Sequence, residues 1–392
     1  MLRRLVVTGL LFLGFAACPG QICQTTHLTD LYCLIPSAFR TTSAPFSAFY
    51  TPFGTELSQL PVAKPSGLIL KFQNGVLAPT NESLGPVFTD RAETIGRSRV
   101  FIGGTFQHFG FNSIDGTKLG NLPIILTYPP PPSSPSVYTV TTNRFDIKAS
   151  QYAFLAAYGV TNHLDVSVVI PVERIAMSVG VNGVEYSQNV TPLPFTEYVP
   201  GSSSGIGDVL LGAKYTVLDK SKIVIAGALN VRVPSGDEFN FLGSGTTGVR
   251  PFVVVSAHGR ISPHVSLGYQ WNGDSILNAN TQGQKQQLPT DFFYSVGADG
   301  TLGHRFTLVA DLLGRHFFNS PRLTSPQSFQ FLNVTASTVQ PYTSSYTRND
   351  LSLGVKAKVF SNLVVTGNAL IKLDNGGLRA IASPLVGLSY SF

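Results

Sequence analysis

The feature that most constrains this chain is a series of strand-length segments joined alternately by tight turns and by long connections. From residue 99 onward, segments of about ten residues alternate apolar with small or polar side chains. Such alternation predicts β-strands, because successive strand side chains point to opposite faces. Hairpin turns are predicted where short polar stretches separate two such segments. These turns lie at 161–163, 219–222, 262–264, 303–305 and 361–362.

The order of turns and connections predicts a closed membrane barrel. The segment 99–111, ten hairpin strands and a last segment make twelve, and all tight turns then fall on one rim. Bacterial single-chain membrane barrels have an even strand number, short periplasmic turns and longer outer loops. We predict an all-β fold, a transmembrane antiparallel up-and-down β-barrel of about twelve strands, with ten to fourteen possible and both termini on the periplasmic rim. The long connections are predicted at 112–143, 175–204, 235–248, 273–289, 318–348 and 374–378.

The last segment, 379–392, ends on an aromatic residue. Leu388, Tyr390 and Phe392 share one face of the predicted strand, opposite Ser389 and Ser391. A final barrel strand must pair with the first strand, here 99–111, and end in the aromatic girdle of the membrane interface. The ending also resembles the C-terminal signal of bacterial outer-membrane barrels, which implies that barrel assembly machinery reads these three residues. The alternative is a sandwich strand that happens to end the chain.

The charge distribution fits a barrel whose outside faces lipid. Only 12% of residues are charged and the net charge is +6, with no basic run interleaved with aromatics that would predict nucleic-acid binding. A charged residue facing lipid at mid-depth costs about 2–4 kcal/mol, so charges within strands are expected to face the lumen. Trp271 and 292–294 are expected in the lipid girdle or the wall. The predicted lumen-lining residues are Asp208, Lys214, Arg232, Asp299, Asp311, Arg315, Lys356 and Lys358.

Three domains are predicted along the chain. Residues 1–20 read as a signal peptide, because two arginines precede an apolar run too short to span as a helix. Cys18 lies in a stretch that partly matches a lipoprotein cleavage box. Residues 21–98 are rich in proline and form either an irregular periplasmic extension or a plug, and Cys23 and Cys33 either pair or stay as thiols. Residues 99–392 are the barrel, which the leader would direct to the outer membrane of a bacterium.

Two motifs carry a family resemblance. Gly205, Gly207 and Asp208 form a G-x-G-D strand entry, and 234–237 read Pro-Ser-Gly-Asp. With the hairpin at 158–173, these stretches resemble the bacterial outer-membrane family named for the meta-pathway of phenol degradation. The resemblance covers about 145–392 and leaves 21–98 unexplained. It implies similarity to transporters of the fatty-acid-channel type, and passive uptake of small hydrophobic or aromatic solutes across outer-membrane lipid.

Two prolines allow a further interpretation. Pro171 and Pro234 cannot donate a ladder hydrogen bond, so each either ends a strand at the rim or marks a local opening in the wall.

The sequence contains little that indicates catalysis. Residues 201–205 match G-x-S-x-G, but that motif needs a strand–turn–helix setting, and here a Gly/Ser loop entering a strand is expected. His163, His264 and His304 are each expected in a tight turn, exposed to solvent, without metal-ligand spacing. We therefore predict no catalytic residue, no metal and no cofactor. The alternatives to a channel are a barrel-embedded outer-membrane hydrolase and a non-conducting structural barrel.

Overall fold

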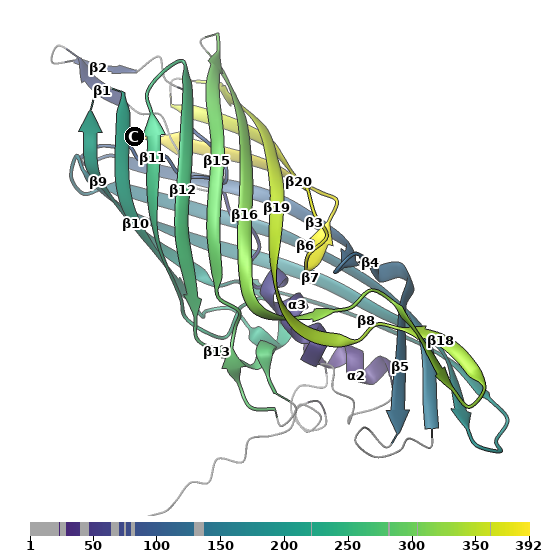
Figure 1. The fold of residues 1–392 in the computed structure, drawn as a ribbon. Coiled ribbons are helices and arrows are strands. Elements are labelled where there is room, and N and C mark those ends of the chain that lie inside the picture. Colours follow the sequence, from purple (N-terminus) through teal and green to yellow (C-terminus); the bar gives the residue numbers. More distant parts are fainter. Residues whose placement is uncertain are drawn as a thin grey trace, which may run out of the picture.

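In a computed structural model the chain forms a long, tilted barrel whose strands extend beyond one rim (Figure 1). The structure describes residues 23, 29–39, 47–63, 70–73, 76–79, 83–128, 137–220, 222–280, 283–303, 305–360 and 362–392.

Twelve antiparallel strands close the barrel, which confirms the predicted fold class. Closure is made by β3, which pairs with the last strand, β22, on one side and with β6 on the other. The predicted pairing of the last segment with 99–111 is therefore confirmed. Around the barrel the strands are β3 (Val100–Ile114), β6 (Val137–Gly159), β7 (Leu164–Ser187), β9 (Val209–Lys220), β10 (Ile223–Val233), β11 (Gly248–Ala257), β12 (Ile261–Asn272), β15 (Asp291–Leu302), β16 (Phe306–Leu323), β19 (Pro341–Lys358), β20 (Leu363–Lys372) and β22 (Ala382–Ser391).

The two rims differ as predicted. The five tight turns and the C-terminus lie at one end, the short-turn rim, where the Phe392 N–H donates to the Val100 carbonyl at 2.8 Å. The opposite end is the long-loop rim (Figure 1). The predicted turn at 262–264 is wrong, because the chain turns at 258–260 and Pro263 lies within β12. Pairing of β12 with β11 begins only at His264, so the proline needs no donor on that side.

Most long connections contain more strand than predicted. β7 has 24 residues, whereas about 9–11 cross a membrane, and its second half pairs with β8 rather than β9. The expected polar connection at 175–204 is therefore wrong. Those at 112–143 and 318–348 also contain paired strands. The additional elements are β4 (Thr117–Lys118), η2 (Leu119–Asn121), β5 (Leu122–Tyr128), β8 (Leu193–Ile206), η3 (Glu238–Asn240), β13 (Asp274–Ser275), η4 (Ile276–Asn278), β14 (Gln286–Gln287), β17 (Gln327–Phe331), β18 (Val334–Thr338) and β21 (Leu378–Ala380).

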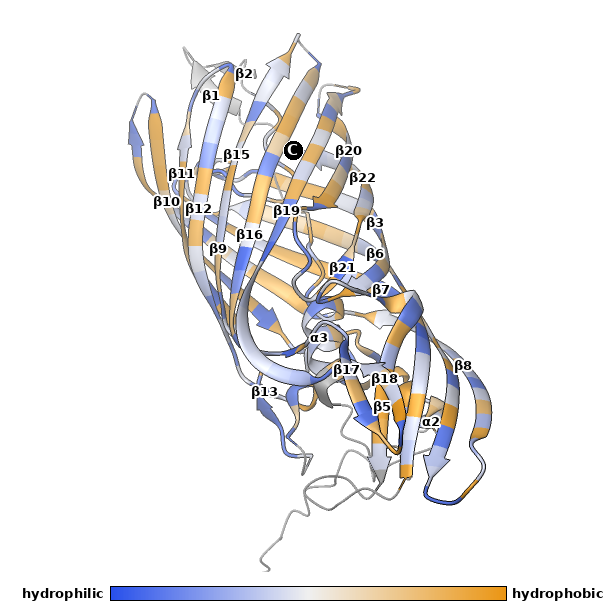
Figure 2. Ribbon diagram, turned by 45° about the vertical axis from the view of Figure 1, so that its right-hand side comes forward, coloured by the Kyte–Doolittle hydropathy of each residue, from blue (hydrophilic) through white to orange (hydrophobic). Residues whose placement is uncertain are grey.

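Apolar and polar residues follow one another along the barrel strands (Figure 2), and many large apolar side chains of these strands are exposed. On β9, Leu211, Tyr215 and Val217 are exposed, whereas Thr216 is buried, as is Asp208 just before the strand. With no water in the hydrocarbon core, a closed barrel is the β-structure that satisfies its backbone hydrogen bonds in a membrane. The closed barrel, its apolar exterior and its rim asymmetry place the protein in the bacterial outer membrane.

A helical cap occupies the long-loop rim. The cap consists of η1 (Leu31–Cys33), α2 (Leu34–Ala38) and α3 (Ser47–Leu57). The hairpin of β1 (Leu70–Gln73) and β2 (Val76–Pro79) lies at the other end, near the short-turn rim (Figure 1). None of the helices that the structure describes has the length and apolar character needed to cross a bilayer. The first described residues thus lie at the long-loop rim, not the short-turn rim. Cys23 and Cys33 form a disulfide.

The cap is held by close packing on the extended strands. Tyr32 stacks on Tyr50 with ring centroids 3.9 Å apart, and α2 lies on β7 and β8. A Cβ on Gly201 of β8 would lie 2.8 Å from Leu34 Cδ1, so glycine allows this approach. Apolar alternation continues along β7 past the membrane because Ile175, Met177 and neighbours face the cap.

Candidate functional site in the barrel interior

A segment that we call the strap, residues 83–95, crosses the interior near the short-turn rim. At its start, Lys356 of β19 donates to the Pro86 carbonyl at 2.6 Å. Further along, Thr216 of β9 donates to the Ala92 carbonyl at 2.6 Å, and the Ile95 N–H donates to Asp165 of β7 at 2.9 Å. The strap therefore contacts inward side chains around much of the barrel.

The centre of the strap is fixed by a buried ionic network. Arg91 pairs with both carboxylate oxygens of Asp299, and side-chain exposure is 6% for Arg91 and 0% for Asp299. His264 lies 2.8 Å from Asp311 and 2.8 Å from the Thr89 hydroxyl. The expectation of a solvent-exposed turn histidine is therefore wrong for His264, since its ring lies inside the barrel. His163 does lie in a tight turn, and His304 falls outside the described residues.

The predicted lumen residues lie in two groups. Near the strap are Asp299, Asp311, Lys356 and Lys214, whose ammonium donates to the Arg91 carbonyl at 2.9 Å. Lys358 is half-buried at the short-turn end of β19. Nearer the long-loop rim are Arg315, Asp208 and Arg232. Of these, Arg315 pairs with Asp291, and Arg232 Nε lies 3.4 Å from Asp208 Oδ2.

Sequence reasoning missed three arginines in the second group. Arg348 of β19 pairs with Glu56 of α3, and Arg379 of β21 pairs with Asp350 at 2.6 Å. Arg250 of β11 is the third. Arg250 and Arg348 have the parity of inward neighbours on their strands, which is the signal that could have identified them.

The two family motifs contact each other. The Ser235 hydroxyl donates to the Gly207 carbonyl at 2.8 Å and accepts from the Val209 N–H at 2.9 Å. Asp208 accepts from the Gly236 N–H at 3.1 Å and from Ser244. A Cβ on Gly236 would lie 2.5 Å from the Leu242 carbonyl oxygen. These motifs therefore fold the 234–247 loop back onto the β8–β9 junction, where it meets the cap.

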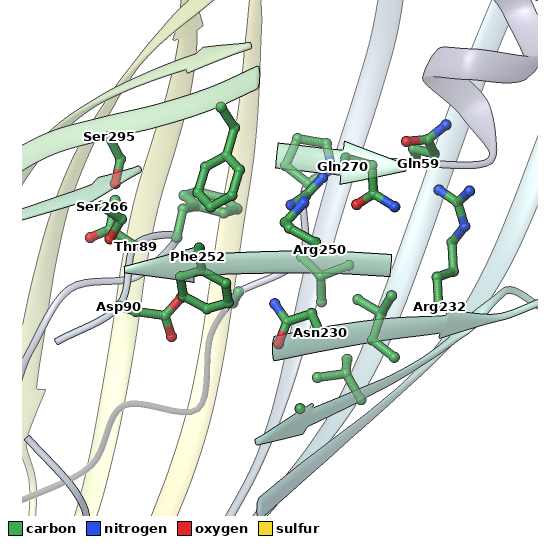
Figure 3. A pocket seen from close by; sticks show the side chains of 18 of the residues that line it. Gln59, Thr89, Asp90, Asn230, Arg232, Arg250, Phe252, Ser266, Gln270 and Ser295 are labelled. Carbon is green, nitrogen blue, oxygen red and sulfur yellow. The ribbon is translucent and has the colours of Figure 1, made fainter. Parts of the chain in front are cut away.

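Between the cap and the strap lies a chamber of about 230 Å³ that is partly open to solvent. This volume lies just below the range of about 300–1,000 Å³ that is typical of small-ligand pockets. Its wall combines apolar residues, among them Leu210, Phe252 and Leu313, with the arginine group. Figure 3 shows Arg250, Asn230 and Gln270 at one part of this wall and Phe252 beside them. Phe293 also lines it, whereas Trp271 and Phe292 are exposed on the outer surface.

The remaining sequence features have structural explanations. Pro234 follows the end of β10, as the strand-end interpretation predicts. Pro171 lies inside β7, between the residues paired with β9 and those paired with β8. The G-x-S-x-G match lies within β8 rather than in a loop, and Ser203 is paired with Ile175. No strand–turn–helix elbow is formed there.

The apolar side chains of the last strand, Leu388 (52% exposed), Tyr390 (37%) and Phe392 (60%), face outward.

Comparison with known proteins confirms the family resemblance for part of the chain. Residues 131–314 match the family model described as "Putative MetA-pathway of phenol degradation". No curated protein matches the sequence.

Among solved structures, an outer-membrane channel from Pseudomonas putida F1 is similar with a TM-score of 0.48 and 11% identity, over 77% of this chain and 98% of the other. A FadL homologue from Pseudomonas aeruginosa gives a TM-score of 0.34 and 9% identity, over 75% of this chain and 90% of the other. The CymD monoaromatic hydrocarbon channel gives 0.31 and 12%, over 76% and 88%. The fold assignment itself rests on the strand order and closure described above.

Proposed function

We propose that this barrel is an outer-membrane channel for passive uptake of small hydrophobic or aromatic solutes, with the cap and strap serving as an internal plug. The observation that carries the proposal is the chamber, which is bounded by the barrel wall, by residues 58–63 that follow the cap, and by the strap. Apolar side chains such as Phe252, Phe293 and Leu313 line it next to polar groups. A water-filled general pore has a polar interior, so aromatic and aliphatic lining favours an apolar solute.

The family match supports the same solute class, since its description names phenol degradation. Plugging is supported by the strap's buried contacts, because Arg91 and Ala92 are fixed to β15, β9 and β11. In this arrangement the strap obstructs the short-turn end, and passage requires it to shift. The eight predicted lumen residues would then act in two ways, with those near the strap holding it and those near the cap shaping the chamber.

Solute flux into proteoliposomes tests the channel proposal. A swelling panel would compare phenols, short fatty acids and sugars of similar size, with protein-free liposomes as control. We expect phenols to enter faster than sugars. Equal rates for phenols and sugars would indicate a general pore. Absence of swelling with every solute would favour the structural barrel and overturn the proposal.

A further inference from the structure

Arg250 differs from the other arginines of the chamber in lacking an acidic partner. Arg232, Arg315 and Arg348 each have a carboxylate within 3.4 Å. Arg250 makes no hydrogen bond or ion pair with any residue that the structure describes, and its Nε atom is buried without a partner. Arg250 is half-buried and lines the chamber. A guanidinium inside the barrel without a counter-charge is costly, so its position indicates a place for an anion.

The groups around Arg250 strengthen this reading. Arg315, Arg232 and Arg348 lie within electrostatic range of Arg250. Each of the three is already balanced by a carboxylate, that of Asp291, Asp208 or Glu56, so the charge of Arg250 is left over. The local charge therefore remains positive, which favours a bound anion.

An amide side chain stands on each side of Arg250. Asn230 of β10 is its direct cross-strand partner. Gln270 of β12 occupies the corresponding position on the other side and also lines the chamber. Amide groups of this kind supply hydrogen bonds that can orient a polar ligand head.

Two aromatic rings lie next to Arg250. Phe252 and Phe293 meet edge to face, with ring centroids 5.6 Å apart. They meet across Gly268, where a Cβ would lie 2.5 Å from both side chains. The Arg250 guanidinium carbon lies 4.8 Å from the Phe293 ring centroid. Stacking on a ring occupies the face of a guanidinium and leaves its N–H edges free for a carboxylate.

We propose that the chamber binds small aromatic carboxylates, with Arg250 holding the carboxylate and the paired rings of Phe252 and Phe293 contacting the aromatic part. This deepens the proposed channel function, on which it rests, by naming the solute class as aromatic acids rather than neutral hydrocarbons alone. Bidentate pairing with a carboxylate is the geometry that a guanidinium favours.

Equilibrium binding to the purified full-length protein in nanodiscs tests the site without requiring flux. The probes are benzoate, phenylacetate and the neutral analogue benzyl alcohol, measured by calorimetry. Arg250→Gln should weaken benzoate binding about tenfold to a hundredfold, as expected for a lost charged hydrogen bond, and should change benzyl alcohol binding little. Arg250→Lys keeps the charge without the fork and should fall in between.

The controls separate this site from general effects. Arg260→Gln removes an exposed arginine from the turn before β12 and should leave benzoate binding unchanged, and heat-modifiable migration reports folding of each variant. Benzoate binding that is unaffected by both Arg250 variants would overturn the proposal, as would chloride competing as well as phenylacetate. If benzoate binds through Arg250 but no solute crosses liposomes, the site stands and the channel function fails.

Discussion

Asp299→Asn offers a direct test of whether the strap closes the barrel. The substitution removes the negative charge that faces Arg91 while keeping the side-chain size. Arg91 would then remain buried without its main partner, since its side chain is only 6% exposed. The strap should be displaced from Asp299 more often, because the Arg91 side chain becomes hydrated when the strap moves away.

The size of the effect follows from the burial of the pair. Removing one partner of a buried ion pair costs about 3–5 kcal/mol, and each 1.4 kcal/mol is about a tenfold change in an equilibrium. The population with a displaced strap should therefore rise by roughly a hundredfold to several thousandfold. Remaining contacts, such as Lys356 with the Pro86 carbonyl, should keep the strap attached along part of its length.

Single-channel recording in planar bilayers measures this shift. We expect Asp299→Asn to show frequent large openings that are rare in the parent protein. The double variant Arg91→Met with Asp299→Leu should restore closure, because an apolar pair replaces the ions without leaving a charge unpaired. Arg97→Gln is the matched control, since Arg97 is exposed. A folded Asp299→Asn barrel with unchanged openings would refute the reasoning.

Two further predictions concern assembly and the cap. Deleting Phe392, which contacts Tyr390 at 4.7 Å between ring centroids, should reduce the heat-modifiable, membrane-inserted fraction more than it alters any ligand binding, and normal insertion would contradict a role for the last strand as an assembly signal. Gly201→Val should push α2 off β8, because Leu34 leaves no room for a Cβ. It should expose the cap to limited proteolysis and lower stability by about 1–3 kcal/mol, whereas Gly180→Ala on β7, with no atom closer than 3.8 Å to the added Cβ, should digest like the parent. Equal protection of both variants would argue against close packing there.

The barrel could be predicted from sequence because its signals are local. Alternation along 350–360 or 223–233 fixes which side chains face lipid, and turn positions fix the rims. Prediction was wrong where a local signal has two readings. Pro263 suggested a turn, yet a proline is tolerated where the neighbouring strand has not begun to pair. The stretch 175–204 was predicted as a polar connection, yet β7 continues through its first part because β8 and the cap cover it.

The interior site was less accessible to sequence reasoning, because its partners lie far apart along the chain. Nothing near Arg91 indicates that Asp299 would be its partner 208 residues away. Inward charges could be identified by parity, but the difference between Arg250 and Arg232 depends on which carboxylate reaches each one. That depends on the 234–247 loop and α3, whose paths are set by packing rather than by periodicity.

The route of the chain through the barrel has a mechanical consequence. The cap lies at the long-loop rim, residues 58–63 line the chamber, and the strap lies near the short-turn rim just before β3. The barrel therefore encircles its own N-terminal segment, and the cap with its disulfide lies outside one end of the lumen. The pairing of β22 with β3 closes the barrel around this segment. A strap that is displaced from Asp299 stays inside the barrel between the cap and β3, so it can return without refolding of the barrel.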